Sequence, residues 1–196
     1  MVNFKASIQA VDYIIKEVSD NGILDKLTIL KLLFFAERYS MRKYAQSITN
    51  DKFVAMRCGP VASLTLDLIG FKDLPKDKLD YTNEILEKIP PYFVKSKGVL
   101  ISRDDYDELS DTDIEALCFS TQNYGQYSSK KLVEITHKFK EWNRFESKLK
   151  KQDTKFDILI DDFFAKTTEQ TNEYSIIPDE VVELNKEFFK EAEFDR

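Results

Sequence analysis

The stretch Ile29-Leu30-Lys31-Leu32-Leu33-Phe34-Phe35-Ala36 decides the fold, because every residue in it except Lys31 is apolar or aromatic. A helix that is apolar nearly all round is buried on every side, so we expect a central core helix that ends near Tyr44. Asp25 is the expected N-cap of this helix. Lys31 either extends its ammonium group to the surface or meets a buried carboxylate.

A second informative stretch follows, Val54-Ala55-Met56-Arg57-Cys58-Gly59-Pro60-Val61. We interpret residues 53–58 as a short buried strand and Gly59 as the turn after it. Pro60 suits the first position of a helix, where no amide hydrogen is needed, so we expect a helix over residues 60–69. Arg57 would then lie near the start of this helix and anchor an acidic group, and an internal salt bridge is favoured over a contact with a partner.

Further helices are indicated by apolar residues at helical spacing and by N-cap residues. Asn3 precedes an amphipathic pattern over residues 4–19. Ser110, with Asp113 three residues later, gives a capping-box pattern for a helix that ends near Asn123. The other helices that we expect before the C-terminal segment cover residues 81–88, 129–138 and 142–150.

A β-hairpin is expected from residues 92–94 and 99–101, and it could pair with the strand at residues 53–58. The sequence therefore predicts a mostly α fold, a compact helical domain around the central apolar helix with a small two- or three-stranded antiparallel sheet. This domain would cover residues 1–152.

Residues 153–196 form the predicted second unit, an acidic helical C-terminal extension with 13 acidic and 5 basic side chains, a net charge of −8. Two apolar stripes at helical spacing lie in it. Their members are Phe156, Leu159 or Ile160, and Phe163 in the first, and Val181, Leu184 and Phe188 in the second. A basic run precedes it, made of Lys138, Lys140, Arg144, Lys148, Lys150 and Lys151. We favour two oppositely charged helix faces that attract each other over contacts of either face with a charged partner.

Composition excludes several classes of protein. The 196 residues are 42% hydrophobic and 33% charged, and no apolar run reaches the ~18 residues that a membrane span needs. The first residues lack a signal-peptide pattern, so we expect a cytoplasmic protein without membrane contact. Cys58 and Cys118 are then reduced thiols, and no metal or cofactor is expected.

The ordered set of motifs resembles the Panacea domain of SocA-like antitoxins. The match rests on residues 31–36 and 48–51, on residues 56–61, on residues 109–117 (LSDTDIEAL), and on His137 and Trp142. The resemblance implies a mostly helical antitoxin without catalytic activity that pairs with a toxin encoded beside it. It also implies that this protein could be an adaptor that presents the toxin to a ClpXP-type protease. The source could be a bacterium or a phage.

Two alternatives stay open at this point. His137, the only histidine, could serve a small hydrolase, although no nucleophile-elbow motif accompanies it and a structural histidine is favoured. The basic segment at residues 138–151 could bind nucleic acid, which the acidic total makes less favoured. His137 and Trp142 would not share a face of an unbroken helix, but a helix junction near Lys140 between them would let both line one groove.

We expect the toxin to contact the face of the domain that carries Arg57, His137 and Trp142, and aromatic residues of the acidic tail. Adjacent aromatics point to different sides of a helix, so one of each Phe pair in the tail would be exposed if the tail packs on one side. An exposed aromatic tail would also favour a homodimer. The predicted partner-binding residues are Arg57, Gly59, Pro60, Val61, His137, Trp142, Phe163 and Phe188.

Overall fold

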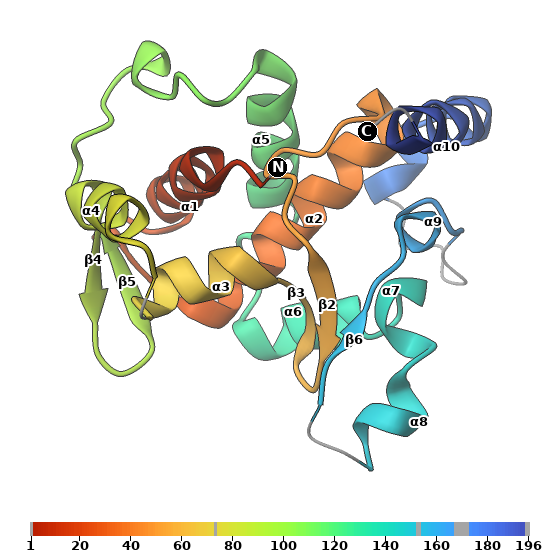
Figure 1. Ribbon diagram of the computed structural model, residues 1–196, viewed down its shortest axis with the longest axis horizontal. Helices are drawn as coiled ribbons and strands as arrows, with labels where there is room; N and C mark the ends of the chain where they lie inside the picture. The colour runs from red at the N-terminus through yellow and green to blue at the C-terminus, as the bar shows by residue number, and fades with distance from the viewer. Residues whose placement is uncertain (1, 73, 152–153, 167–172, 195–196) are drawn as a thin grey trace.

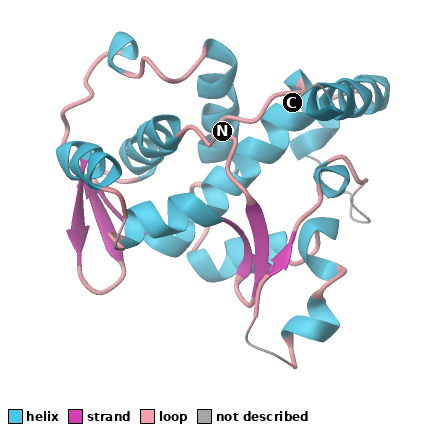
Figure 2. Ribbon diagram, viewed as in Figure 1, coloured by secondary structure: helices cyan, strands magenta, loops and turns pink. Residues whose placement is uncertain are grey.

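The computed structural model describes residues 2–72, 74–151, 154–166 and 173–194. Helices dominate this part of the chain, which also contains two three-stranded antiparallel sheets (Figures 1 and 2). The predicted mostly α class is confirmed. The α-helices are α1 (Phe4–Val18), α2 (Lys26–Tyr44), α3 (Ser63–Gly70), α4 (Lys76–Ile85), α5 (Asp111–Tyr124), α6 (Ser129–Thr136), α7 (Lys140–Asn143), α8 (Glu146–Leu149), α9 (Ile160–Phe163) and α10 (Asp179–Phe194).

Two short 3-10 helices, Arg103–Asp105 and Glu173–Ile176, complete the helical elements of the described chain. The strands are β1 (Ile23–Asp25), β2 (Phe53–Met56), β3 (Gly59–Ala62), β4 (Leu86–Ile89), β5 (Phe93–Ser96) and β6 (Phe156–Asp157). The first sheet has the order β1-β5-β4 and the second the order β3-β2-β6.

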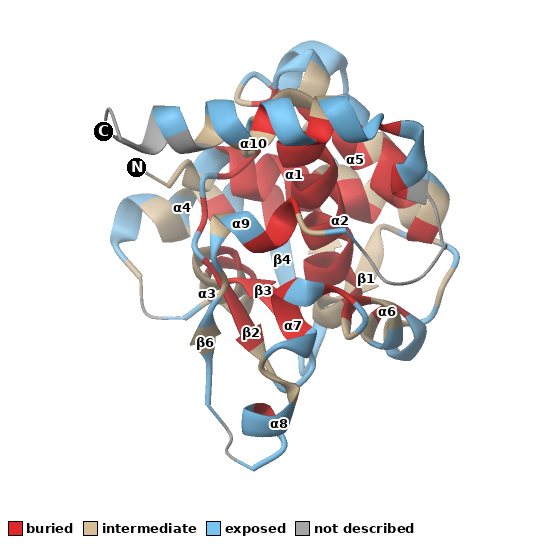
Figure 3. Ribbon diagram, turned by 90° about the vertical axis from the view of Figure 1, so that its right-hand side faces the viewer, coloured by how far each residue is buried: buried red, intermediate tan, exposed pale blue. Residues whose placement is uncertain are grey.

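Helix α2 runs through the middle of the molecule, as the apolar stretch predicts (Figure 1). Every residue from position 28 to position 42 is buried, and α1, α5 and α10 cover different sides of the helix. Figure 3 shows these buried residues enclosed by exposed surface on the outer elements. The expected N-cap is present, since the Asp25 carboxylate accepts a hydrogen bond from the Thr28 amide at 3.0 Å.

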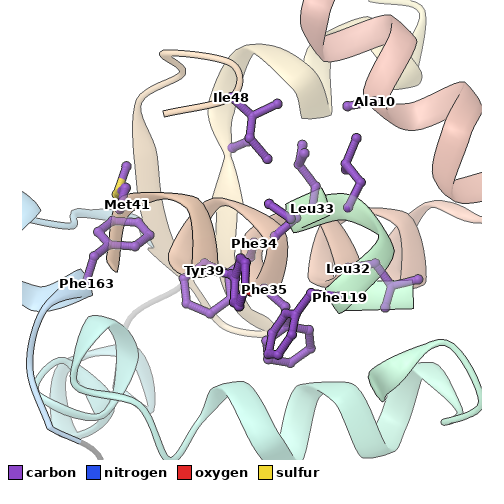
Figure 4. Close-up of a cluster of buried hydrophobic side chains, with 14 of the residues drawn as sticks. Ala10, Leu32, Leu33, Phe34, Phe35, Tyr39, Met41, Ile48, Phe119 and Phe163 are labelled. Carbon is purple, nitrogen blue, oxygen red and sulfur yellow. The ribbon is translucent and has the colours of Figure 1, made fainter. Parts of the chain in front are cut away.

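Aromatic rings fill the space around α2 (Figure 4). The Phe34 ring lies within 6.1 Å of the rings of Phe53, Phe139 and Phe163. Phe35 stacks on Tyr124 of α5 at a centroid distance of 4.0 Å. Residues far apart in the sequence therefore meet at one helix, and the core extends from α1 to the C-terminal segment.

The sheets differ from the prediction in their pairing. The hairpin is formed by β4 and β5, so it lies earlier in the chain than expected, and residues 99–101 are not a strand. It pairs with β1 and not with β2. Strand β2 pairs with β3 and β6 instead. Hairpins fix only local register, and a partner from a distant segment is not encoded in a short apolar run.

Pro60 lies in strand β3 and not at the start of a helix, which corrects the expected helix over residues 60–69. Helix α3 begins at Ser63, and Pro60 pairs with Ala55. Strand β3 is at the edge of its sheet, where the missing amide hydrogen of a proline leaves the ladder intact. The N-terminus of α3 is capped by Asp51, whose carboxylate accepts hydrogen bonds from the Leu64 and Thr65 amides at 3.0 and 2.8 Å.

Other helix boundaries also shift. The helix expected over residues 81–88 is α4, which ends at Ile85 before the strand β4. The helix expected over residues 142–150 is broken into α7 and α8. The capping box at Ser110 is confirmed, because Ser110 Oγ accepts from the Asp113 amide and the Asp113 carboxylate accepts from the Ser110 amide.

The C-terminal segment packs into the same core as the rest of the described chain. Residues 156 and 157 form strand β6, where an apolar helical stripe was expected, because they pair with β2. The buried apolar side chains in the described part of the segment are Phe163, Phe164, Tyr174, Ile177 and Val182. The net charge of the chain changes at the predicted boundary at residue 152, but residues on both sides of this boundary belong to one hydrophobic core. Opposite charges also meet here, since Arg144 lies 2.9 Å from Asp162.

Candidate functional site

The β2–β3 hairpin packs against the C-terminal end of α6 and the start of α7, and half of the predicted site residues meet there. We call this region the hairpin joint, formed by Lys31, Gly59, Pro60, Thr136, His137 and Trp142. Gly59 has φ +103°, which disfavours any residue with a side chain. A Cβ at this position would lie 2.7 Å from Thr136 Oγ1 and 2.8 Å from Lys31 Nζ. The hairpin therefore approaches α2 and α6 as closely as a glycine permits.

Lys31 is fully buried in the hairpin joint, which corrects both expectations for it. Its ammonium group neither reaches the surface nor meets a carboxylate within the described chain, and Nζ donates to the Pro60 carbonyl at 2.7 Å. Burial lowers the pKa of Lys31 to about 7, because the charged form loses its hydration, and nearby Cys58 opposes this shift. The hydrogen bond ties the core helix to the hairpin.

His137 and Trp142 stack face to face across the junction between α6 and α7. Their ring centroids are 3.4 Å apart and their planes differ by 4°. The prediction of a helix junction between them is confirmed. Trp142 Nε1 donates to the Met56 carbonyl at 2.7 Å, so the stack holds the end of β2. The rings fill the junction, and the buried Trp142 does not line an open groove.

The geometry gives His137 a structural role. Burial and, after it, the charge of Lys31 lower the pKa of His137 to about 4, so the imidazole is neutral near pH 7. A general base works best with a pKa near the working pH. Nε2 of His137 is buried without a hydrogen-bond partner in the described residues, and neither a nucleophile nor an orienting acid hydrogen-bonds to this side chain there. The hydrolase alternative therefore has no support from the site.

The eight predicted partner-binding residues fall into two groups. Five are buried and contact other parts of the chain, namely Gly59, Pro60, Val61, Trp142 and Phe163. Arg57 is exposed at the two-residue turn of the hairpin, away from the start of α3, and has no salt bridge within the described part of the chain. His137 is half-buried, and Phe188 is 54% exposed on α10.

Helix α10 contacts α2 with one side and leaves an acidic and apolar side in solvent. Val182 is buried and the Asn185 side chain donates to the Arg42 carbonyl at 3.0 Å. The predicted stripe of Leu184 and Phe188 points outward, with 51% and 54% of the residue surface exposed. We define the outer face of α10 by its exposed residues, Glu180, Glu183, Leu184, Glu187, Phe188 and Glu191 (Figure 3).

The expectation for the aromatic pairs in the tail holds for one pair only. Phe188 is exposed while Phe189 is half-buried against the Phe164 ring, at a centroid distance of 6.2 Å. Phe163 and Phe164 are both buried, because α9 is a single short turn enclosed by α2, α7 and α10.

Sequence reasoning missed a buried ion pair beside the hairpin joint. Arg38 Nε lies 2.8 Å from Glu141 Oε1, and both side chains are at most 1% exposed. Burial raises the pKa of Glu141, and the charge of Arg38 opposes this. Glu37 is also buried and accepts hydrogen bonds from the Ile48 and Thr49 amides at 3.1 and 2.9 Å. The sequence does indicate that Glu37 and Arg38 are buried, since they follow directly after the apolar octet, but it does not indicate their partners.

All six residues of the basic run are exposed, and three of them make the following contacts. Arg144 pairs with Asp162, Lys150 lies 2.8 Å from Glu146, and Lys148 lies over the Phe156 ring at 5.6 Å. Of these contacts, the Arg144–Asp162 pair joins the basic run to the acidic tail, as the favoured interpretation expects. Across the described ranges, no group of three or more His, Cys, Asp or Glu side chains is arranged to hold a metal ion. None of the described helices is long and apolar enough to cross a membrane.

Comparison with known proteins gives one match. A search of curated proteins and a search of solved structures each find no match for this chain. The family model described as "Antitoxin SocA-like, Panacea domain" matches residues 29–143, which contain most of α2, the β2–β3 hairpin, α5, α6 and α7. The matched part thus contains most of the central helix and the whole hairpin joint, whereas α9 and α10 lie outside it. The chain belongs to the family of SocA-like antitoxins with a Panacea domain.

Proposed function

We propose that this protein is an antitoxin that neutralises a cognate protein toxin by binding it directly through the outer face of α10. The observation that carries this proposal is the exposed apolar stripe of Leu184 and Phe188 on a helix whose other side is already docked. Such a stripe is not needed for the fold, because the core contacts of α10 are made by its opposite side.

The outer face of α10 has the form of a helix that binds in a groove. Its residues have the spacing i, i+3, i+4, i+7, i+8 and i+11, so they share one helix face of about 16 Å in length. The four exposed glutamates surround the two apolar side chains. The fitting partner is therefore a protein with an apolar groove bordered by lysine or arginine. Arg57 and His137 lie outside this face and stay secondary candidates for contact.

Binding supports two mechanisms of neutralisation. The antitoxin can cover the active surface of the toxin, or it can carry the toxin to a ClpXP-type protease. We favour occlusion as the basic activity, because it requires only the interface and no additional recruiting surface. The partner is expected to be encoded next to this protein, and the encounter would take place in the cytoplasm.

The test is rescue of cell growth. The neighbouring reading frame is expressed with the wild-type chain, with a Leu184→Ala/Phe188→Ala variant, or with an Ile101→Ala variant as matched control. Ile101 is 86% exposed and lies in the loop before the Arg103–Asp105 turn. Removing two anchors from an interface costs at least about 2 kcal/mol, which is about thirtyfold in affinity.

We expect the wild-type chain and the Ile101→Ala variant to restore growth and the double variant to fail, with equal amounts of folded protein. Rescue by all three would exclude the outer face of α10 as the binding surface. A harmless neighbouring frame would instead disprove the pairing with that gene. Repeating the rescue in a strain without the protease separates the mechanisms, because occlusion persists there and delivery does not.

A further inference from the structure

A pocket of 480 Å³ lies where α2 meets the Glu173–Ile176 turn and the start of α10. Only Glu180 is shared with the outer face of α10, and none of the hairpin-joint residues takes part. The pocket is lined by basic side chains, by aromatic and apolar side chains, and by two carboxylates. The lining residues that matter here are Arg38, Arg42, Tyr174, Ile177, Asp179 and Glu180.

Arg38 is fixed in the pocket with one nitrogen unused. Its guanidinium group lies between the rings of Phe139 and Tyr174, at 4.6 and 4.5 Å from their centroids. Nε pairs with Glu141, and Nη2 donates to the Ala165 carbonyl at 2.9 Å. Nη1 is buried and has no hydrogen-bond partner among the residues that the structure describes. A rigid, unsatisfied donor of this kind costs free energy unless a ligand completes it.

Arg42, one helical turn further along α2, repeats this situation. It is 6% exposed, and its Nη1 donates to the Phe163 carbonyl at 3.2 Å. Nε is buried without a hydrogen-bond partner in the described chain. No described carboxylate lies within 4 Å of it, whereas Arg38 is paired with Glu141 and Lys166 with Asp179 at 2.7 Å. Burial and the charge of Arg38 lower the pKa of Arg42 to about 10, which still leaves it charged near pH 7.

We infer that this pocket binds a small organic carboxylate beside Arg38 and Arg42, which both line it. The charge of the ligand compensates Arg42, and the planar carboxylate fits the planar donors of a guanidinium group. The volume exceeds what one oxyanion fills, and Tyr174, Ile177 and Pro178 offer a wall for an apolar body.

The acidic residues at the pocket narrow the class of ligand. Asp179 and Lys166 form an ion pair in which both side chains are more than 60% exposed, and Glu180 is exposed beside them. Two carboxylates at the solvent side repel a dianion more strongly than a monoanion. A carboxylate is therefore favoured over a phosphate.

The experiment uses benzoate as the probe, and benzamide as a neutral probe of the same shape. Binding to the full chain is followed by amide chemical shifts and by calorimetry, with inorganic phosphate as a third arm. We expect benzoate to shift resonances of residues 174–179 and of α2, benzamide to bind at least about tenfold more weakly, and phosphate to bind more weakly than benzoate.

Three variants complete the test. Arg42→Gln removes the uncompensated charge, Ser175→Trp fills the pocket while both of its arginines are kept, and Arg57→Gln removes an exposed arginine elsewhere. We expect at least about tenfold weaker benzoate binding for the first two and no change for the third. If Arg42→Gln does not fold, Ser175→Trp decides alone. Equal affinity for benzoate and benzamide, tighter binding of phosphate, or unchanged benzoate affinity in Ser175→Trp would overturn the inference.

Discussion

Replacing Gly59 by alanine tests the hairpin joint most directly. At φ +103° an alanine is strained by about 1–3 kcal/mol. Its Cβ would also displace the Lys31 ammonium group, which it would approach to 2.8 Å. The hydrogen bond from Lys31 Nζ to the Pro60 carbonyl, 2.7 Å long, would then be lost. A buried hydrogen bond to a charged group contributes about 1.5–3 kcal/mol. The expected loss is therefore about 2.5–6 kcal/mol, a large part of the ~5–15 kcal/mol that holds a domain folded.

The assay is urea denaturation followed by the fluorescence of Trp142, the only tryptophan, and by far-UV circular dichroism. Gly98→Ala is the matched control, because Gly98 has φ +71° and a Cβ there would meet nothing within 4 Å. This control carries the backbone strain without the contact, so we expect it to lose only about 1–2 kcal/mol.

A comparison of the two glycine variants decides the argument. Equal losses of free energy for Gly59→Ala and Gly98→Ala would refute the claim that close contact with α2 and α6 requires glycine in the hairpin. A Lys31→Met/Gly59→Ala double variant gives a second check. It should lose less than the sum of the two single variants, because the two positions share one contact.

Titration and charge give three more expectations. The pKa of His137 is lowered to about 4 in the folded state, so between about pH 4 and 6.5 the unfolded chain binds the proton and the folded chain does not. The free energy of unfolding should therefore rise with pH in this range more steeply than in His137→Phe. Urea denaturation of both proteins at several pH values would contradict this if the two profiles coincide. The pKa of Lys31 falls from 10.5 to about 7, so stability should rise again between about pH 7 and 10.5 and this rise should vanish in Lys31→Met. Glu141→Gln leaves Arg38 buried without its carboxylate and should cost about 3–5 kcal/mol by denaturation, whereas Glu146→Gln at an exposed pair should cost much less. Similar losses would refute the burial argument.

The parts of the fold that depend on local chemistry were predictable from the sequence. The octet at residues 29–36 is apolar on all sides and forms a buried helix. Asn3, Asp25, Ser110 and Ser128 each cap the helix that follows, because a side-chain oxygen next to free amides is a local arrangement. The family, likewise, could be identified from motifs inside the matched region.

The remaining features depend on partners far along the chain. Pro60 is compatible with a helix start and with an edge strand, and only the pairing with β2 selects the strand. Phe156 fits a helical stripe until it pairs with Ala55, about 100 residues earlier. Arg38 and Glu141 are 103 positions apart, so the sequence offered two charged residues and no sign that they meet.

The candidate site was predictable only in part, for a physical reason. The sequence placed Gly59, His137 and Trp142 in one region, and the structure brings them together in the hairpin joint. Periodicity also found the stripe of Leu184 and Phe188, but it cannot tell which side of a helix faces the core. Helix α10 docks through Val182 and Asn185, and its more regular apolar stripe stays in solvent.

The position of β6 and α10 in the core has a consequence for how the protein is made. Residues 156–194 leave the ribosome after α2 and β2, yet they supply the partner strand of β2 and one cover of α2. A nascent chain that lacks them exposes the apolar side of its central helix and an open strand edge, which favours association with other chains. The same late step docks α10 and turns Leu184 and Phe188 outward. Closure of the core and presentation of the toxin-binding surface that we propose are thus one event in the life of the chain.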